Sequence, residues 1–481
     1  MSIGFIAAIV LYFSVVFAIG CKVRKKNATS KDLLMGGRSL NFWVTALSAQ
    51  ASDMSSWMFM AFPMSLLVKG LPAIWIGIAV IFGMYASWHF VAPRLRVETE
   101  KYGAFTISSF FAKRLNDVRG TIRLLSAMMT IFFLTYYVAA GLISFGLLFE
   151  SFFKLDYLIG VVAAMIVMIA YTFIGGFVSV AWVDLFQALF LLCAIIIVPI
   201  IAFMKIDGIH DILETAHAAN IPMSLLPENA LSILYPLLGW GLGYFGMPHI
   251  ITKFMGIKDP KELTKSKYLG IGWEFLAILA AASVGIVGIA YFKNGLANPE
   301  LVFIQMVKEL FHPFTAGLLL CGVMAATIST MDSQILVCAS VIAEDLYKFF
   351  SKNSDSKKEV RAFRLGVLAV ALVAFWISLS RSTTIMDTVY YAWAGLGSSF
   401  SPLVLMILYS KRVNLQGAIA GILTGGSVAA LWPTVNSWLI HNGIMGELPS
   451  MIPGFTLSML SIYAVSYLTR EKVETAEIRA V

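Results

Sequence analysis

The 481-residue chain has few charged residues for its length. Only 13% of its residues are Asp, Glu, Lys or Arg, whereas 59% are hydrophobic. Soluble proteins carry about 25% charged residues, and a soluble protein of this size would need more polar side chains to cover its surface. The mean hydropathy of +0.83 therefore excludes a set of soluble domains and predicts a polytopic membrane protein.

Several kinds of functional motif are also missing. The chain contains no GxxxxGK[ST] sequence, which disfavours an ATP-driven pump. It has no nucleophile–base pair, so we do not expect an enzyme. The six histidines include no pair at metal-ligand spacing. The four cysteines lie in or beside apolar segments, match no metal motif and are interpreted as small packing residues: Cys21, Cys193, Cys321 and Cys338.

The apolar segments predict thirteen transmembrane helices, because about 20 apolar residues cross a bilayer. The first lacks a preceding basic cluster and is interpreted as a span instead of a signal peptide. The predicted spans are 2–21, 42–68, 72–92, 124–148, 157–179, 183–204, 229–250, 268–292, 313–345, 365–380, 385–409, 414–434 and 450–469. With the N-terminus outside, 29 of the 35 Lys and Arg residues fall on the cytoplasmic side, including the C-terminal tail. This excess predicts contact with anionic lipid and does not require nucleic-acid binding.

The span order predicts four parts of the chain. They are 1–41 (first helix and basic cytoplasmic loop), 42–204 (first inverted repeat, spans 2–6), 205–409 (second inverted repeat, spans 7–11) and 410–481 (spans 12–13 and a short tail). The first helix of each repeat is interrupted by polar residues or glycines. Corresponding breaks in two repeats indicate a binding site near the middle of the membrane.

The second span contains the sequence AQASDMSSW, in which Asp53 is the only charged residue between 42 and 68. An Asp at the centre of a span costs about 3 kcal/mol on insertion scales. Neighbouring serines can cap a broken helix and free backbone carbonyls for a cation. The alternative is an Asp that is hydrogen-bonded within the bundle for packing.

The seventh span contains GWGLGYFGMPHI, in which four glycines and Pro248 disfavour a continuous helix. Trp240 and Tyr244 are four residues apart and share a helix face. A broken backbone with aromatic walls suits a small solute that has one apolar side. A proline kink with packing aromatics is the alternative.

The ninth span contains AATISTMDSQ, with Ala326, Ser329, Thr330 and Ser333 at i, i+3, i+4 and i+7. These residues form a narrow polar stripe, and their hydroxyl and carbonyl oxygens suit Na⁺. Helix packing by small residues explains the stripe as well, but it does not explain Asp332.

Four stretches resemble the sodium/solute symporter family, most closely its proline-transporting branch. They are GGRSLNFWVTALSAQASDMSSWMFM, YTFIGGFVSVAWVD, GLGYFGMPHI and STMDSQILVCASVIAEDLYK. The resemblance implies an all-α LeuT-like core of 5+5 inverted-repeat helices within about thirteen spans. It also implies Na⁺-coupled import of L-proline, or a similar small zwitterion, across the bacterial inner membrane by alternating access. We expect Na⁺ as the coupling ion, no organic cofactor, no nucleic acid and no obligate protein partner.

The same resemblance implies functional positions. The sodium site would use the carbonyls of Ala51, Met54 and Ala326 and the hydroxyls of Ser329 and Thr330. Positions that matter for coupling in the family match Asp53, Ser52, Ser55 and Arg38. The solute pocket would include Tyr137, Trp240, Tyr244 and Pro248.

Three residues depart from the family pattern. Met247 replaces a usual Gln beside the pocket, Ser56 replaces a Gly, and Asp332 replaces a small hydroxyl residue. Because the family's optional second sodium site uses the position of Asp184, we expect a possible second cation or proton site at Asp184, Asp332 and Ser333. The alternative is that Asp332 faces water on the inner side.

Alternatives remain for the function. The same kind of symporter could carry another amino acid, pantothenate, another carboxylate or a sugar, with or without proton coupling. A sugar would want more hydrogen-bonding side chains in its pocket. A sensor is disfavoured because no signalling domain is evident, and a channel because no continuous polar stripe crosses the spans.

Overall fold

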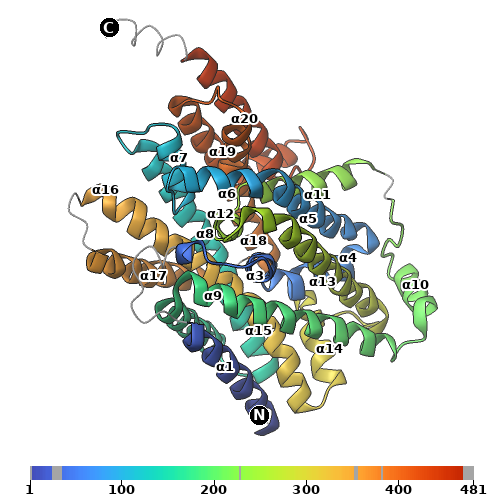
Figure 1. The fold of residues 1–481 in the computed structure, drawn as a ribbon. Coiled ribbons are helices and arrows are strands. Elements are labelled where there is room, and N and C mark those ends of the chain that lie inside the picture. The colour runs from blue at the N-terminus through green and yellow to red at the C-terminus, as the bar shows by residue number, and fades with distance from the viewer. Residues whose placement is uncertain (1–2, 24–34, 227–228, 352–355, 381–382, 470–481) are drawn as a thin grey trace, which may run out of the picture.

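The computed structural model describes residues 3–23, 35–226, 229–351, 356–380 and 383–469, and nearly all of them are helical (Figure 1). Within these ranges the only strand-like pairing is an isolated bridge between Leu40 and Ile257. Most of the predicted loop 22–41 and the tail after Thr469 lie outside the described residues. The predicted all-helical architecture is therefore what the described part of the chain adopts.

The first half of the chain contains α1 (Ile3–Val23), η1 (Gly36–Arg38), α3 (Phe42–Met54), η2 (Trp57–Ala61), α4 (Phe62–Lys69), α5 (Ile74–Ala86), η4 (Ser87–Val91), α6 (Ala92–Lys101), α7 (Ile107–Arg114), α8 (Thr121–Leu148) and α9 (Tyr157–Phe203). The second half contains α10 (Gly208–Ala218), α11 (Leu231–Gly241), η6 (Leu242–Phe245), α12 (Pro248–Met255), α13 (Leu263–Tyr291), η8 (Pro299–Leu301), α14 (Val302–Leu310), α15 (Pro313–Val341), η9 (Ile342–Tyr347), α16 (Lys348–Phe350), α17 (Ser356–Ser378), α18 (Ile385–Tyr409), α19 (Leu415–His441) and α20 (Met451–Leu468).

Ten helices in the described ranges are long and apolar enough to cross a membrane. The other three predicted spans correspond to shorter apolar helices, at Trp57–Lys69, Tyr157–Phe173 and Leu231–Phe245. The first and third of these belong to the two interrupted spans, and the second is the first part of α9. Helix length alone therefore does not confirm the predicted number of thirteen.

The fifth and sixth predicted spans are separated at Gly176, a few residues before the expected turn at 180–182. The helix α9 continues through these residues, and its non-helical position is Gly176, with φ 60° and ψ −171°. Glycine adopts a positive φ without a steric penalty, whereas 180–182 contains no residue that breaks a helix. The prediction of a turn at 180–182 was wrong for this reason.

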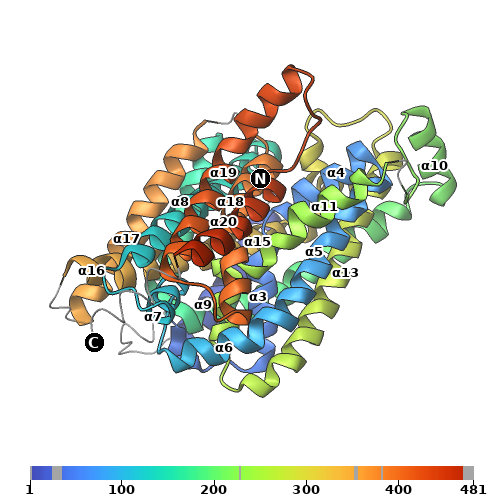
Figure 2. The same cartoon turned by 90° about the horizontal axis from the view of Figure 1, so that it is seen from above.

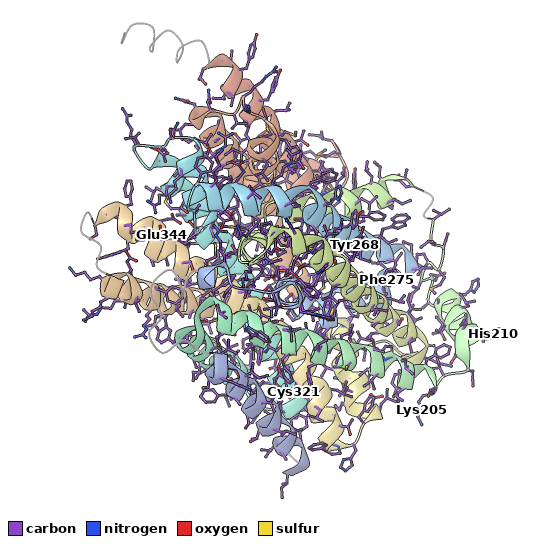
Figure 3. The ribbon with its side chains drawn as sticks, in the orientation of Figure 1. Lys205, His210, Tyr268, Phe275, Cys321 and Glu344 are labelled. Carbon is purple, nitrogen blue, oxygen red and sulfur yellow. The ribbon has the colours of Figure 1, made fainter. Side chains whose placement is uncertain are left out.

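The helices α3 and α15 lie at the centre of the bundle, with α9 against both (Figures 1 and 2). Every residue from Val44 to Pro63 and every residue from Leu319 to Val341 is buried. By contrast, Tyr268 and Phe275 on α13 are more than half exposed (Figure 3). Exposed apolar side chains of this kind suit contact with lipid, and the polar residues of α3 and α15 are kept away from it.

One end of the bundle gathers the basic loops, and we call it the basic end. Leu40 pairs with Ile257, Arg96 donates to the carbonyl of Ile257 at 2.8 Å, and Arg123 forms an ion pair with Asp345 at 2.8 Å. The Lys- and Arg-rich loops that are predicted to be cytoplasmic are therefore brought together at one end of the bundle.

Candidate functional site

The second predicted span is broken at Ser55, as its sequence predicts. The helix α3 ends at Met54 and η2 begins at Trp57. Ser55 has φ 39°, which is uncommon for a residue with a side chain. Its backbone N–H donates to Oγ1 of Thr330 at 3.0 Å, so it is directed away from Ala51, the carbonyl that it would reach in a continuous helix.

Hydroxyl groups of α15 reach the freed carbonyl. Oγ of Ser329 donates to the carbonyl oxygens of Ala51 and Ala326, at 2.8 and 3.0 Å. Oγ1 of Thr330 lies 3.1 and 3.0 Å from the same two oxygens. Met54, whose carbonyl was also predicted to bind sodium, is buried at the end of α3. Four of the five predicted ligand residues therefore place their oxygens within hydrogen-bonding distance of one another. Neutral hard oxygens of this kind suit Na⁺.

Asp53 points toward the second broken helix. The hydroxyl of Tyr244 donates to Oδ2 of Asp53 at 2.8 Å, and Asp53 is 5% exposed. The structure gives Asp53 no hydrogen bond to Ser329 or Thr330 among the described contacts. We call the oxygens of Ala51, Ala326, Ser329 and Thr330 the oxygen set. The Asp53 carboxylate thus lies between the oxygen set and the aromatic residues of the second break.

The break in the seventh predicted span lies at Gly246 and Met247, between η6 and α12. Its carbonyls are bound by neighbouring helices: Ser401 donates to the carbonyl of Gly243 at 2.9 Å, and Ser87 donates to that of Tyr244 at 2.8 Å. A Cβ atom at Gly246 would lie 2.3 Å from the backbone nitrogen of Ser401. The second break is therefore packed tightly against α18.

A small cavity lies between the two breaks, and we call it the aromatic cavity. Its volume is about 10 Å³, which is about enough for one water molecule. The residues that line it are Asp53, Met54, Trp57, Val80, Tyr137, Trp240, Tyr244 and Trp393. Three of the predicted solute-binding residues, Tyr137, Trp240 and Tyr244, are brought together here.

Pro248 and Met247 do not line the aromatic cavity. Met247 is fully buried, and Pro248 lines a separate cavity toward the basic end. The sequence reading missed Trp57 and Trp393, whose rings lie 5.3 and 6.0 Å from that of Trp240. Trp57 ends the AQASDMSSW stretch and Trp393 lies on the eleventh predicted span, and neither gave a signal that distinguishes it from a packing residue.

A larger cavity of about 840 Å³ opens at the end opposite to the basic end. It is lined by residues of α8, α17, α18, α19 and the segment before α20, and it includes the acidic side chains of Asp387 and Glu447. Tyr390 lines this cavity, and its ring lies 5.1 Å from that of Trp240. Two aromatic side chains therefore separate the large cavity from the aromatic cavity.

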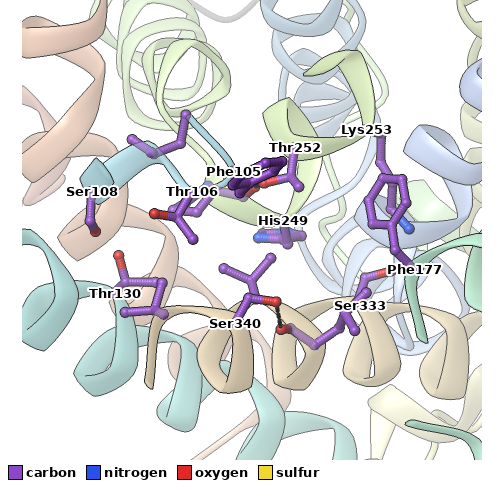
Figure 4. A pocket seen from close by; sticks show the side chains of 15 residues that line it. Phe105, Thr106, Ser108, Thr130, Phe177, His249, Thr252, Lys253, Ser333 and Ser340 are labelled. Atoms are coloured by element: carbon purple, nitrogen blue, oxygen red, sulfur yellow. Dashed lines mark hydrogen bonds between the residues drawn. The ribbon is translucent and has the colours of Figure 1, made fainter. Parts of the chain in front are cut away.

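Toward the basic end, a cavity of about 20 Å³ is lined by residues from α7, α12 and α15, including His249, Lys253 and Ser333 (Figure 4). Nζ of Lys253 forms an ion pair with Oδ2 of Asp184 at 3.0 Å, and both side chains are buried. Lys253 also lies 5.4 Å from the ring of Phe177. The sequence reading placed Lys253 in a loop, which was wrong, because the Asp184 carboxylate compensates its charge inside the bundle. The feature of the sequence that could have indicated this position is that Lys253 is a single Lys in an apolar run.

Asp184 also accepts a hydrogen bond from Oγ of Ser48 at 2.7 Å, and Oγ of Ser52 lies 3.5 Å away. Oγ of Ser52 lies 2.8 Å from Oγ of Ser333. Two of the three residues of the predicted second site, Asp184 and Ser333, therefore share one polar cluster. A cationic side chain, that of Lys253, already belongs to the same cluster.

Asp332 faces a different cavity. It is 2% exposed and lines a space of about 10 Å³ with Tyr171, Ser179 and residues of α1. No hydrogen bond or ion pair joins Asp332 to Asp184 in the described part of the chain. Its burial also does not support the alternative that Asp332 faces water.

Arg38 ties three segments together at the basic end. Its Nη1 donates to the carbonyl of Met255 at 2.6 Å, at the end of α12, and its Nη2 donates to the carbonyl of Ala104 at 3.1 Å. Burial lowers the pKa of Arg38 to about 10, so the guanidinium stays charged at neutral pH. The role that the structure gives Arg38 is to hold the start of α3 against the end of α12.

The sequence is similar over nearly its full length to those of proteins named sodium/proline symporters. Residues 33–425 match the family described as the sodium:solute symporter family. Sodium/proline symporter 2 of Staphylococcus saprophyticus is 41% identical over 475 residues, which cover 96% of this chain and 92% of that protein. The sodium/proline symporter of Staphylococcus aureus is 41% identical over 476 residues, with the same coverage.

Solved structures show the same fold. A Na⁺-coupled sialic acid symporter in a substrate-bound outward-open state superposes with a TM-score of 0.80 at 19% identity, covering 97% of this chain and 98% of that one. Mhp1, a transporter of the nucleobase-cation-symport-1 family, superposes with a TM-score of 0.55 at 15% identity, covering 92% and 96%. The predicted LeuT-like fold is confirmed. With this fold, and with a family match that spans most of its length, the chain belongs to the sodium:solute symporter family, whose members are secondary transporters that use Na⁺ as the coupling ion.

Proposed function

We propose that the chain is a Na⁺-coupled symporter that imports L-proline across the bacterial inner membrane by alternating access. The observation that carries this proposal is the contact between the two breaks. The oxygen set of α3 and α15 and the aromatic cavity lie on either side of Asp53, which accepts the hydroxyl of Tyr244. An ion and a solute bound at these places would act on the same short segment.

The sodium ion binds among the carbonyls of Ala51, Met54 and Ala326 and the hydroxyls of Ser329 and Thr330. These groups are supplied by two helices, α3 and α15, so the ion stabilises the arrangement in which the helices lie together. A ligand shifts a conformational equilibrium by as much as its affinities for the two states differ. Sodium bound here therefore couples the ion gradient to the positions of α3 and α15.

Ser52, Ser55 and Asp53 connect this ion site to its surroundings. Ser55 donates through its backbone to Thr330, and Ser52 contacts Ser333 on the same helix. Asp53 acts through its charge and through Tyr244, without being an ion ligand. Through these three residues, binding of the ion changes the contacts of α3 with α15 and with the aromatic cavity.

The solute binds in the aromatic cavity after the cavity enlarges. A proline ring is apolar and packs against the aromatic side chains that line the cavity, which include Trp57, Trp240 and Trp393. With a volume of about 10 Å³, the aromatic cavity is too small for proline, so this conformation is a closed state. Tyr390 and Trp240 block the path from it to the 840 Å³ cavity. Displacement of these two rings opens the path from that side.

The basic end faces the cytoplasm and the N-terminus lies outside. Loops rich in Lys and Arg remain on the cytoplasmic side during insertion, and these loops gather at one end of the bundle. The 840 Å³ cavity then faces the outside, which is where an importer collects its solute. The two inverted repeats are residues 42–204 and 205–409, and each begins with one of the broken helices.

Another small solute is the second candidate. Met247 has no hydrogen-bonding group where the proline branch usually carries an amide, and a different amino acid, pantothenate or another carboxylate would fit the same coupling mechanism. The predicted second cation site at Asp184, Asp332 and Ser333 stays a prediction. Because Lys253 pairs with Asp184, one sodium ion is the simpler stoichiometry.

Uptake of radiolabelled proline by proteoliposomes tests the proposal. An inward Na⁺ gradient should drive accumulation, and unlabelled proline should compete better than other amino acids, pantothenate and sugars. Uptake that is indifferent to Na⁺ would overturn the coupling mechanism. Na⁺-driven uptake of a competitor, with none of proline, would overturn the substrate alone. The Na⁺:solute ratio of wild type and of Asp332→Ser, measured in the same vesicles, tests the second site: equal ratios would remove it.

A further inference from the structure

Glu274, on α13, is a fully buried carboxyl group that the transport mechanism above does not use. It is 0% exposed, and its only described hydrogen bond comes from Nε2 of Gln50, at 3.4 Å. Its other oxygen, Oε1, has no hydrogen-bond partner, and no ion pair among the described residues includes Glu274. An ionised carboxylate in such a place is penalised by several kcal/mol unless a cation or a proton compensates it.

Two further buried side chains near Glu274 each have one polar atom without a hydrogen-bond partner. Gln50, on α3, is 0% exposed, and its amide oxygen Oε1 accepts no described hydrogen bond. The indole Nε1 of Trp88, on η4, is also without a partner. Gly270 lies one turn before Glu274, and a Cβ atom there would lie 3.0 Å from Nε2 of Gln50 and 3.6 Å from Nε1 of Trp88. A glycine thus leaves room for polar groups from three helices to gather.

The kinds of atom in this cluster determine which ligand fits. Na⁺ would require several oxygens around it, but the cluster supplies only the amide oxygen of Gln50 and the carboxyl oxygens of Glu274. The other polar groups at the cluster, the Gln50 amide N–H and the Trp88 indole N–H, are hydrogen-bond donors. Donors repel a metal cation, whereas they stabilise an oxygen that accepts hydrogen bonds. The cluster is therefore unsuited to a sodium ion.

A proton fits the same atoms. The hydroxyl of a neutral Glu274 can donate to Oε1 of Gln50, while Nε2 of Gln50 donates to the other carboxyl oxygen. This acid–amide pair gives a hydrogen-bond partner to both unpaired atoms, Oε1 of Gln50 and Oε1 of Glu274, and it removes the buried charge. We propose that Gln50 and Glu274 form a proton-binding site, in which the Glu274 carboxyl group carries the proton in this closed state.

Among the residues that the structure describes, no basic side chain forms an ion pair or hydrogen bond with Glu274, and an acidic side chain lies nearby on α3. Asp53 lies one turn from Gln50, the residue that contacts Glu274, and its carboxylate accepts the hydroxyl of Tyr244 on η6. Lys267, two turns before Glu274 on α13, lies closer to the basic end, where its Nζ is 3.4 Å from Nδ1 of His89 on η4. Loss of the proton would place a second negative charge close to Asp53. The site therefore links the proton concentration to the segment that binds sodium.

Infrared spectroscopy of the purified protein in lipid tests the proposal without any transport measurement. The wild type at neutral pH should show the C=O band of a protonated carboxyl group, which shifts in D₂O. Glu274→Gln should lose this band, because the glutamine amide is neutral but has no carboxyl group. Asp332→Asn is the matched control for another buried carboxyl group, and the band assigned to Glu274 should persist in it. Identical carboxyl C=O bands in the spectra of the wild type and Glu274→Gln would overturn the proposal.

Gln50→Leu supplies a second and independent readout. Without the amide, the Glu274 carboxyl group should stay protonated but lose its hydrogen bond, so the band should remain and move to higher frequency. An unshifted band would show that Gln50 does not contact the acid and would overturn the pairing. If the proposed proline transport fails while the band behaves as expected, the substrate is wrong and the proton site stands.

Sodium-driven uptake then shows whether the proton matters for transport. Wild-type uptake should fall as the pH rises, because the site loses its proton, whereas Glu274→Gln should keep its rate over the same range. Equal pH dependence of the two proteins would remove the link between this proton and transport.

Discussion

The two broken helices at the centre of the bundle satisfy their backbones in different ways. At the first break, the freed carbonyl of Ala51 meets only hydroxyl groups of α15, which can turn toward a carbonyl or toward a cation. At the second break, the carbonyls of Gly243 and Tyr244 are held by serines of α18 and η4, and the carbonyl of Trp240 by the indole of Trp393. The first break is thus suited to exchange partners, and the second is locked by packing.

This difference suggests a division of labour. An ion can replace hydroxyl–carbonyl hydrogen bonds with metal–oxygen contacts, at little loss to the oxygens concerned. A break that is closed by an indole and by close backbone contact offers no such exchange, but it holds aromatic rings in fixed positions. The first break then senses sodium, and the second shapes the wall of the solute cavity.

The largest effect is expected from the buried ion pair that joins Lys253 on α12 to Asp184 on α9, near the basic end. Lys253→Met would leave the buried carboxylate of Asp184 without its cation, and breaking such a pair costs about 3–5 kcal/mol. The free energy of unfolding in mixed detergent micelles measures this loss. The matched control is Lys265→Met, because Lys265 is exposed and pairs with Glu262 at 3.6 Å, a contact worth about 0–1 kcal/mol.

Lys253→Arg should recover much of the stability, since it restores a positive charge. If Lys253→Met is as stable as wild type, a sodium ion or a proton must compensate Asp184 instead. That result would revive the second cation site and weaken the view that only the first break senses an ion.

The second effect tests whether the second break is locked by packing. Gly246→Ala would place a methyl group against the backbone of α18, and overpacking of this kind costs about 1–3 kcal/mol. Gly272→Ala is the control, because no atom lies within 4 Å of a Cβ there. Unfolding measurements should show destabilisation by Gly246→Ala only. Equal stabilities would mean that α18 moves away easily and that the second break is a hinge.

The sequence predicted more about the first break than about the second. The polar residues between Ser52 and Ser55 are unusual in an apolar span, so their positions alone indicated the break, and the α15 stripe supplied its partners. The apolar pattern predicted a helical membrane protein, whereas the LeuT-like core was implied by the resemblance to the symporter family. The residues that hold the second break, such as Ser87 and Trp393, lie on other spans, and helix periodicity does not reveal which spans meet.

Lys253 and Glu274 show a further limit of the sequence. A charged residue near the end of an apolar run is usually outside the membrane, so Lys253 was assigned to a loop. Its position inside α12 depends on Asp184, which comes 69 residues earlier in the chain. Glu274 likewise has meaning only beside Gln50, which lies on another helix. Compensation of buried charge is a tertiary property, and the local sequence does not contain it.

The third effect concerns sodium binding at the first break. Thr330→Val keeps the shape of the side chain but removes the hydroxyl that accepts from Ser55 and donates to Ala51 or Ala326. Loss of one buried polar partner costs about 1–3 kcal/mol, so the sodium concentration for half-maximal uptake should rise by about 5- to 150-fold. Thr327→Val is the control, because Thr327 donates only to Val323 within its own helix. A similar sodium dependence in both variants would place the ion elsewhere.

The smallest effect is expected from the single hydrogen bond that joins the two breaks directly. Tyr244→Phe removes the donor to Asp53 and leaves the aromatic ring, so the aromatic cavity keeps its wall. A hydrogen bond to a charged group contributes about 1.5–3 kcal/mol, but Asp53 can recruit a water molecule in its place, which reduces the net loss to about 1 kcal/mol. Because the bond links the ion side to the solute side, the loss should appear as weaker coupling: solute should lower the half-maximal sodium concentration less than it does in wild type. Tyr409→Phe, at an exposed tyrosine that donates to the carbonyl of Phe90, should leave this reciprocal effect unchanged. If Tyr244→Phe also leaves it unchanged, the two breaks communicate through helix packing and not through Asp53.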